Sequence, residues 1–104
     1  MYNISYLPRA ISDIFGIEDY LSKHSATAAN RFAKALDKKV SAIAELPMMH
    51  PAYERDSFFR KMVLGDYLLF YSIDKSRKLI VIHRIFHHSQ NIDSHMRKYR
   101  SHNS

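Results

Sequence analysis

The sequence contains no cysteine, which excludes disulfides, thiolate metal ligands and cysteine nucleophiles. An absence of disulfides is typical of proteins in a reducing compartment, so we expect a cytoplasmic location. No apolar run is long enough to span a bilayer, and the first residues do not have the pattern of a signal peptide. We therefore expect no membrane association. Internal repeats and low-complexity tracts are also absent from the sequence.

What is present is the composition of one small basic domain. The 104 residues allow a single domain over 1–104, and 46% apolar with 25% charged residues is close to the average for an ordered globular protein. The formal net charge is +6 at pH 7. This sign suits nucleic acid, a ribosome or an acidic protein partner, and charge alone does not separate the three.

The most informative stretch is residues 79–91. It opens with branched apolar residues, Leu79–Ile82, and continues through His83–Phe86. It ends in five polar side chains, those of His87, His88, Ser89, Gln90 and Asn91. The apolar part predicts a strand covered on both faces, near the middle of a sheet. We expect this strand to project the polar cluster from a rigid base, where the chemistry or recognition is located.

The remaining pattern predicts short strands and two helices. Alternation predicts strands over residues 2–7, 58–64, 67–73 and 79–86. Apolar residues three or four apart predict helices over 8–23 and 26–46, the second with Ser25 as its N-cap. In the first helix, Asp13, Glu18 and Asp19 are placed on the side away from the core. Gly65-Asp66 is predicted to form a type II′ hairpin turn, and 47–57 a surface loop.

This order, β-α-α-β-β-β, predicts an α+β fold in which a helical hairpin packs on a mainly antiparallel four-stranded sheet. Residues 92–104 remain open between a short helix and a frayed tail. As a helix they would have an apolar stripe of Ile92, His95, Met96 and Tyr99, and they would expose Arg97, Lys98 and Arg100.

The histidines and arginines of the sheet raise the possibility of ribonuclease chemistry. That reaction needs a base for the 2′-hydroxyl, an acid for the leaving oxygen and a cation on the phosphate. His87 or His88 would serve as acid or base, and Arg60 or Arg84 as the cation. The alternative is that these residues end the sheet and bind a partner protein. We favour this alternative because nothing in the spacing fixes a base–acid pair.

Strand alternation limits other combinations. It separates Arg60 from Lys61, and likewise His83 from Arg84, onto opposite faces. A metal site would need His87 and His88 as ligands, together with His83 or His95. Adjacent strand histidines point apart and no carboxylate has a useful spacing, so we expect no metal and no cofactor. Tyr67 and Tyr71 share a face, and either pack in the core or stack on bases.

Four segments carry a family resemblance: Ile11–Tyr20, Ala29–Leu36 with its closing Glu45-Leu46-Pro47, the hairpin Phe59–Tyr71, and the ending Arg84–Asn91. With the predicted element order, they resemble the RelE/ParE superfamily of toxins from bacterial toxin–antitoxin pairs. The ending, an arginine, two apolar residues and a histidine before polar residues and a short helix, is similar to that of the ParE branch.

The resemblance implies one of two modes of action. RelE-type toxins are implied to cleave mRNA on the ribosome, whereas ParE-type toxins are implied to block DNA gyrase, stabilising its complex with cleaved DNA. Leu68 stands where RelE-like toxins tend to carry an arginine, and His88 where they have another basic catalytic residue. The ending fits the ParE branch better.

We therefore predict a ParE-like toxin that binds gyrase and has no catalytic residue. Its expected roles are growth inhibition and plasmid stabilisation. The predicted target contacts are His87, His88, Gln90, Asn91, Arg97, Lys98 and Arg100. The alternative is a ribosome-dependent endoribonuclease that uses His87, His88, Arg60 and Arg84, and a third possibility is a toxin that retains antitoxin binding alone. The resemblance also implies a cognate antitoxin, ParD-like or RelB-like and usually acidic, in a hetero-oligomer.

Overall fold

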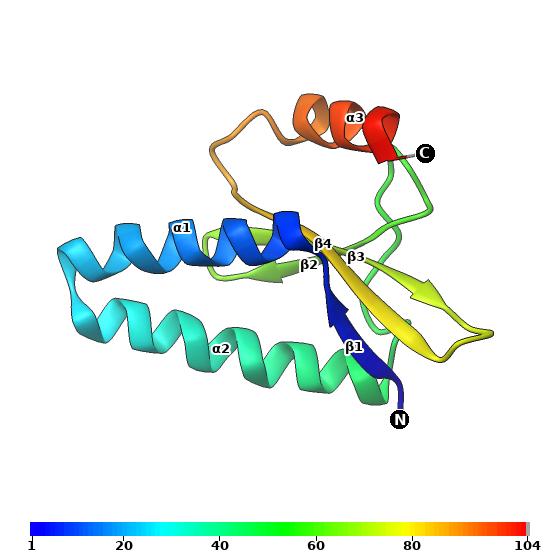
Figure 1. Cartoon of the computed structure of the whole chain (residues 1–104), viewed down its shortest axis with the longest axis horizontal. Helices are drawn as coiled ribbons and strands as arrows, with labels where there is room; N and C mark the ends of the chain where they lie inside the picture. Colours follow the sequence, from blue (N-terminus) through cyan, green and yellow to red (C-terminus); the bar gives the residue numbers. More distant parts are fainter. Residues whose placement is uncertain (104) are drawn as a thin grey trace.

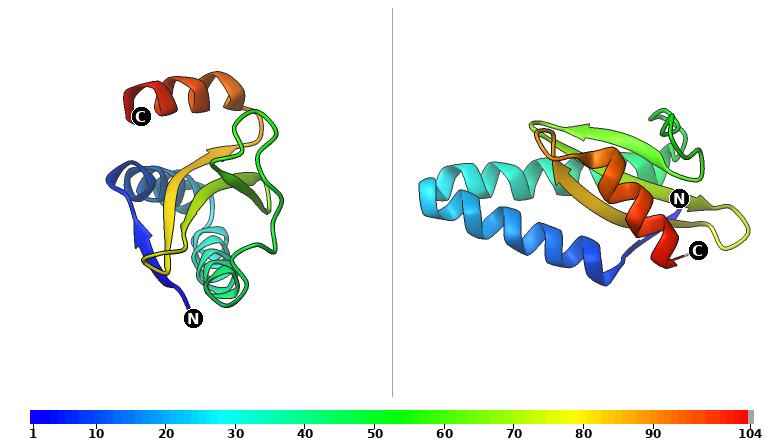
Figure 2. Two further views of the ribbon diagram at one scale, coloured as in Figure 1. Left: turned by 90° about the vertical axis from the view of Figure 1, so that its right-hand side faces the viewer. Right: turned by 90° about the horizontal axis from the view of Figure 1, so that it is seen from above.

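The computed structural model describes residues 1–103 and consists of one sheet between two helical layers (Figure 1). The elements are β1 (Asn3–Tyr6), α1 (Pro8–His24), α2 (Ala26–Glu45), β2 (Arg60–Leu64), β3 (Tyr67–Asp74), β4 (Leu79–His87) and α3 (Ile92–Asn103). The helical hairpin α1–α2 covers one face of the sheet and α3 covers part of the other (Figures 1 and 2). The last residue of the predicted tail, Ser104, lies outside the described residues.

The predicted fold class is confirmed. The four strands have the order β1-β4-β3-β2, with β1 parallel to β4 and the other neighbours antiparallel. β4 is therefore an inner strand, as its apolar run predicts. The predicted boundaries agree with the observed ones to within one residue except at β2, which begins at Arg60 and not at Phe58. Phe58 and Phe59 instead lie in the turn before the strand.

A single serine joins the two long helices. Ser25 has an extended backbone (φ −168°, ψ 122°), and its Oγ accepts a hydrogen bond from the Ala28 N–H at 3.2 Å. The Ser25 N–H donates to the Leu21 carbonyl at 2.8 Å, which closes α1. The predicted N-cap is thus confirmed, and the short connection keeps the helices antiparallel.

The larger core lies between the sheet and the hairpin. Its fully buried members include Ile43 on α2, Met62 on β2, and Ile80 and Ile82 on β4. Tyr71 belongs to the same core, and its hydroxyl donates to the Pro47 carbonyl at 2.7 Å. Tyr67 packs its ring edge on Phe32 at 5.3 Å. Of the two interpretations of these tyrosines, core packing is the correct one.

A smaller, mostly aromatic core lies under α3. It consists of Tyr53, Phe59, Phe70, Phe86, Met96 and Tyr99. Met96 and Tyr99 come from α3, so the C-terminal segment is an ordered helix held by its apolar stripe. Tyr53 is only 2% exposed, which corrects the interpretation of 47–57 as a simple surface loop. This segment contributes Tyr53 to the aromatic core.

β4 contains a bulge at His83. Phe70 of β3 pairs with Arg84, and the next residue, Tyr71, pairs with Ile82, so His83 is the extra residue. The bulge interrupts alternation and turns two successive side chains to the α3 face. His83 contacts Phe59 and Tyr99, and Arg84 lies over Phe86. The prediction that alternation separates His83 from Arg84 is therefore wrong.

The hairpin β2–β3 has the predicted two-residue turn. Leu64 pairs with Tyr67, which leaves Gly65 and Asp66 as the loop. Gly65 has φ +59° and Asp66 does not share this positive φ, as in a type II′ turn.

None of the helices in residues 1–103 has the length and apolar character that a membrane span requires.

Candidate functional site

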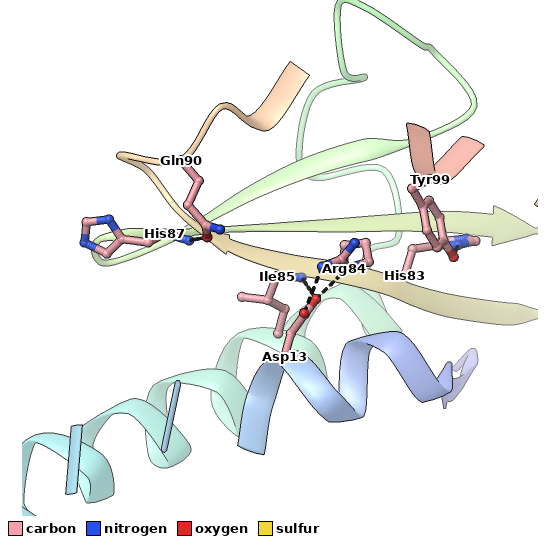
Figure 3. A network of polar contacts seen from close by, with 7 residues as sticks. All are labelled: Asp13, His83, Arg84, Ile85, His87, Gln90 and Tyr99. Atoms are coloured by element: carbon pink, nitrogen blue, oxygen red, sulfur yellow. Dashed lines mark hydrogen bonds and ion pairs between the residues drawn. The ribbon is translucent and has the colours of Figure 1, made fainter. Parts of the chain in front are cut away.

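A buried ion pair joins α1 to the middle of β4 (Figure 3). Arg84 donates from Nε to Asp13 Oδ2 at 2.8 Å and from Nη2 to Asp13 Oδ1 at 3.0 Å. The Ile85 N–H donates to Asp13 Oδ2 at 2.9 Å. The two side chains are only 10% and 15% exposed, so Asp13 is not on the outer side of the helix as predicted. The guanidinium offered as a phosphate ligand is already held by a carboxylate.

His83 is enclosed by the aromatic core. Its Nε2 lies 2.8 Å from the Ser72 hydroxyl and its Nδ1 lies 2.7 Å from the Tyr99 hydroxyl. Burial, with a smaller effect of the nearby Arg100 charge, lowers the pKa of His83 to about 4. Burial also raises the pKa of the Tyr99 hydroxyl. At neutral pH both groups are uncharged and tie α3 to the sheet.

The polar cluster after β4 is a tight turn. The His87 N–H donates to Gln90 Oε1 at 2.9 Å, and the Gln90 N–H donates back to the His87 carbonyl at 3.0 Å. The His88 N–H donates to the Asp66 carbonyl at 2.8 Å, which joins this turn to the β2–β3 hairpin. The side chains of His88, Gln90 and Asn91 are exposed, and the turn presents them from a fixed backbone.

His87 is the last residue of β4, three residues after Arg84, and its side chain points away from the Asp13–Arg84 pair (Figure 3). The Ser89 N–H donates to its Nδ1 at 3.1 Å, and the Ser89 hydroxyl lies 2.6 Å from the same nitrogen. Because Nδ1 accepts a backbone N–H, we assign the proton of the neutral ring to Nε2. The ring packs on His88 at 4.5 Å and on Tyr67 at 5.4 Å. Its outer nitrogen is then a hydrogen-bond donor, which suits recognition better than proton abstraction.

Arg60 is engaged on another part of the sheet. Its Nη1 donates to the His50 carbonyl at 2.6 Å, in the segment that follows α2. Arg60 is opposite Tyr71, whereas His87 is opposite Tyr67, four residues along β3. This separation is roughly 13 Å along the strands. The structure therefore does not bring together the four residues proposed for catalysis.

A cavity of about 320 Å³ on the α3 face contains a different set of polar groups. It is lined by Tyr53, Lys61, Leu68, His88, Gln90, Asn91, Ile92 and Asp93. Lys61 Nζ donates to Glu54 at 3.1 and 3.3 Å, and the Tyr53 hydroxyl donates to Asp93. Burial and the bond to Asp93 raise the pKa of Tyr53. Sequence reasoning missed Tyr53 and Asp93. An acidic residue in the first turn of a helix was the available signal for Asp93.

The three predicted basic contacts of α3 have different environments. Arg97 and Lys98 are exposed, as predicted. Arg100 is half-buried, with its guanidinium 3.9 Å from the Phe58 ring centroid and 3.7 Å from Asp56. Arg100 therefore contributes to packing as well as to charge.

Among residues 1–103, no group of three or more histidine, aspartate or glutamate side chains is arranged to hold a metal ion.

Three solved structures with a similar fold are toxins or toxin–antitoxin complexes. The chain is 25% identical to the metal-bound toxin from Helicobacter pylori, with a TM-score of 0.60, over 86% of this chain and 97% of that one. It is 18% identical to a chain of the intact E. coli RelBE complex, with a TM-score of 0.57, over 82% and 94% of the two chains. A RelBE complex from Mycobacterium tuberculosis gives 19% identity and a TM-score of 0.57, over 83% and 96%.

No curated protein sequence matches this chain. A family model described as the ParE toxin of the type II toxin–antitoxin system, parDE, matches residues 4–92. The match runs from Ile4 in β1 to Ile92, the first residue of α3, and includes the helical hairpin and strands β2, β3 and β4. The chain thus belongs to the ParE toxin family and is a type II toxin of the RelE/ParE superfamily.

Proposed function

We propose that this toxin inhibits DNA gyrase by binding it in the cytoplasm, without chemistry of its own. The main support for a binding role is that the side chains a ribonuclease would need do not lie together in the structure. Arg84 is held by Asp13, and Arg60 is held by a carbonyl roughly 13 Å along the sheet from His87. The choice of gyrase is supported by the match to the ParE family over residues 4–92.

The target surface consists of the turn after β4 and the outer side of α3. Its residues are His87, His88, Gln90, Asn91, Arg97, Lys98 and, through its exposed part, Arg100. The turn is fixed by its own hydrogen bonds and by the contact with Asp66, so it loses little conformational freedom on binding. A rigid surface with donors and cations suits an acidic or polar partner.

A cognate antitoxin is the second partner in this proposal. Two of the similar structures are toxin–antitoxin complexes, and we extend that assembly to this chain. The net charge of +6 favours an acidic antitoxin segment, which would associate quickly with the toxin and neutralise it in a hetero-oligomer.

The test is a supercoiling assay with purified gyrase, relaxed plasmid and purified toxin. We expect loss of supercoiling, accumulation of cleaved plasmid, and reversal of both by the antitoxin. Undiminished supercoiling at an excess of correctly folded toxin would reject gyrase as the target.

Ribosome-dependent mRNA cleavage is a second candidate, favoured by the cavity that Lys61 and His88 both line. These residues would supply a cation and an acid or base, although Glu54 already holds Lys61. In a translating extract, this candidate predicts mRNA cleavage that Lys61→Gln and His88→Gln each reduce by at least about a hundredfold. Intact mRNA with the wild-type toxin would eliminate it.

A further inference from the structure

A separate cavity of about 240 Å³ lies between α3 and the start of α1. It is lined by Arg9, Arg84, His95, Lys98, Tyr99 and His102. The C-terminal half of α3 lies beside the first turns of α1 in both views of Figure 2. Every lining side chain carries a nitrogen or hydroxyl group, and no carboxylate of the described residues lines the cavity. It is the most uniformly basic of the cavities described above.

The walls of this cavity are fixed by packing. Arg84 is 9% exposed and Tyr99 is 5% exposed, so both form an inner wall that belongs to the core. The His95 ring stacks on Phe86 at 5.4 Å with an interplanar angle of 21°. His102 Nδ1 donates to the Lys98 carbonyl at 2.8 Å. A ligand therefore meets groups that are already positioned by the fold.

The charge of the cavity is only partly compensated. Asp13 neutralises Arg84 from the α1 side. Arg9 and Lys98 are exposed, and neither forms a salt bridge with any residue of the described chain, whereas Arg55 pairs with Asp93 and Lys61 with Glu54. Two permanent cations thus line the same cavity, one on α1 and one on α3. Their mutual repulsion is relieved when an anion binds between them.

We propose that this cavity binds a backbone phosphate of a nucleic acid strand. Arginine and lysine are the usual phosphate ligands, and a phosphodiester offers several acceptor oxygens to donors that converge from different directions. Arg9 lies on α1 and Lys98 on α3, so cationic donors line the cavity from two helices. Such a pair suits the several acceptor oxygens of a phosphodiester better than the two oxygens of a single carboxylate.

The inference goes beyond the proposed function, and its test contains no gyrase, so either can fail alone. The affinity of purified toxin for a fluorescent random-sequence DNA duplex and for a single-stranded RNA would be measured by anisotropy at several salt concentrations. The double variant Arg9→Gln/Lys98→Gln removes the two unpaired cations. The double variant Arg31→Gln/Lys34→Gln removes one arginine and one lysine from the exposed side of α2 and is the matched control. Thermal unfolding of each variant verifies the fold.

We expect the cavity variant to bind at least one of the two polymers roughly tenfold more weakly than the control variant, with a salt dependence reduced by about one phosphate contact. The polymer that loses more affinity identifies the source of the phosphate. Equal affinities of the two variants would overturn the proposal, because nucleic-acid binding would then follow net charge alone. Unchanged nucleic-acid binding with loss of antitoxin binding would also overturn it and assign the cavity to protein carboxylates.

Discussion

Asp13 and Arg84 lie 71 residues apart in the chain, and their side chains form a two-point ion pair beneath α3. The same Asp13 carboxylate accepts the Ile85 N–H, next to the bulge in β4. One carboxylate thereby fixes the position of α1 against the central strand and satisfies a buried backbone donor. The ion pair also neutralises Arg84, so its guanidinium is not a free cation for a substrate phosphate.

Replacing Asp13 is expected to destabilise the fold strongly. Asp13→Ala leaves the Arg84 guanidinium buried without a counter-charge, at a cost of roughly 3–5 kcal/mol in the free energy of unfolding. Urea denaturation measures this change. The control is Asp19→Ala on the same helix, where the pair with Lys23 is 67% and 71% exposed and contributes at most about 1 kcal/mol. Similar losses in the two variants would contradict a structural role for the buried pair.

An apolar replacement of both partners should restore much of that stability. In Asp13→Leu/Arg84→Met no charge remains buried, and such exchanges are often neutral or stabilising. We expect the double variant to be more stable than Asp13→Ala. If the double variant is less stable, the cost of leaving the Ile85 N–H without its acceptor is larger than the gain from removing the buried charges.

Acid should destabilise the protein through His83. The pKa of His83 is about 4 in the folded chain against an ordinary value of 6.5. Between these two pH values the histidine is protonated in the unfolded chain but not in the folded chain. The stability contribution is complete above pH 6.5 and is lost as the pH falls towards 4, by up to about 1.4 kcal/mol per pH unit. Urea denaturation between pH 7 and 4 should show a shallower slope for His83→Gln. The matched control is His24→Gln, at an exposed histidine of α1.

The two glycines should respond to alanine with opposite signs. Gly65 has φ +59°, so Gly65→Ala strains the backbone and destabilises the hairpin by roughly 1–2 kcal/mol. Gly16 lies within α1, and Gly16→Ala should stabilise the protein by about 1 kcal/mol. An added Cβ meets no atom within 4 Å at either position, so packing does not explain a difference. Changes in the free energy of unfolding that have the same sign in the two variants would refute the assigned backbone roles.

The sequence predicts the architecture well because apolar periodicity is a local property. The strands, the helical hairpin and the inner position of β4 follow from it, and the Ser25 cap follows from the residue type at the start of α2. The site is less predictable because it depends on two non-local features. The bulge at His83 has no signature in the strand pattern, and Tyr53 occupies an irregular segment with no period. The Asp13 contact had a signal, since an arginine within an apolar strand needs a buried counter-charge.

His87→Gln separates the two modes of action. A gyrase-binding toxin should lose affinity by no more than about tenfold, the usual contribution of one interface side chain. A ribonuclease that used His87 as acid or base would lose cleavage by roughly a hundredfold or more. The gyrase inhibition constant and the rate of mRNA cleavage would be measured for the variant, with His24→Gln as the matched control. A large loss of cleavage with unchanged gyrase inhibition would assign His87 to catalysis.

The most direct test of a non-catalytic toxin is a titration of wild-type toxin against a fixed concentration of gyrase. A toxin that acts by binding must be present at about equimolar concentration, so we predict that inhibition rises with the molar ratio and levels off near equivalence. Gyrase that remains fully active in an excess of toxin, while far smaller amounts of the same preparation degrade mRNA in a translating extract, would contradict the account.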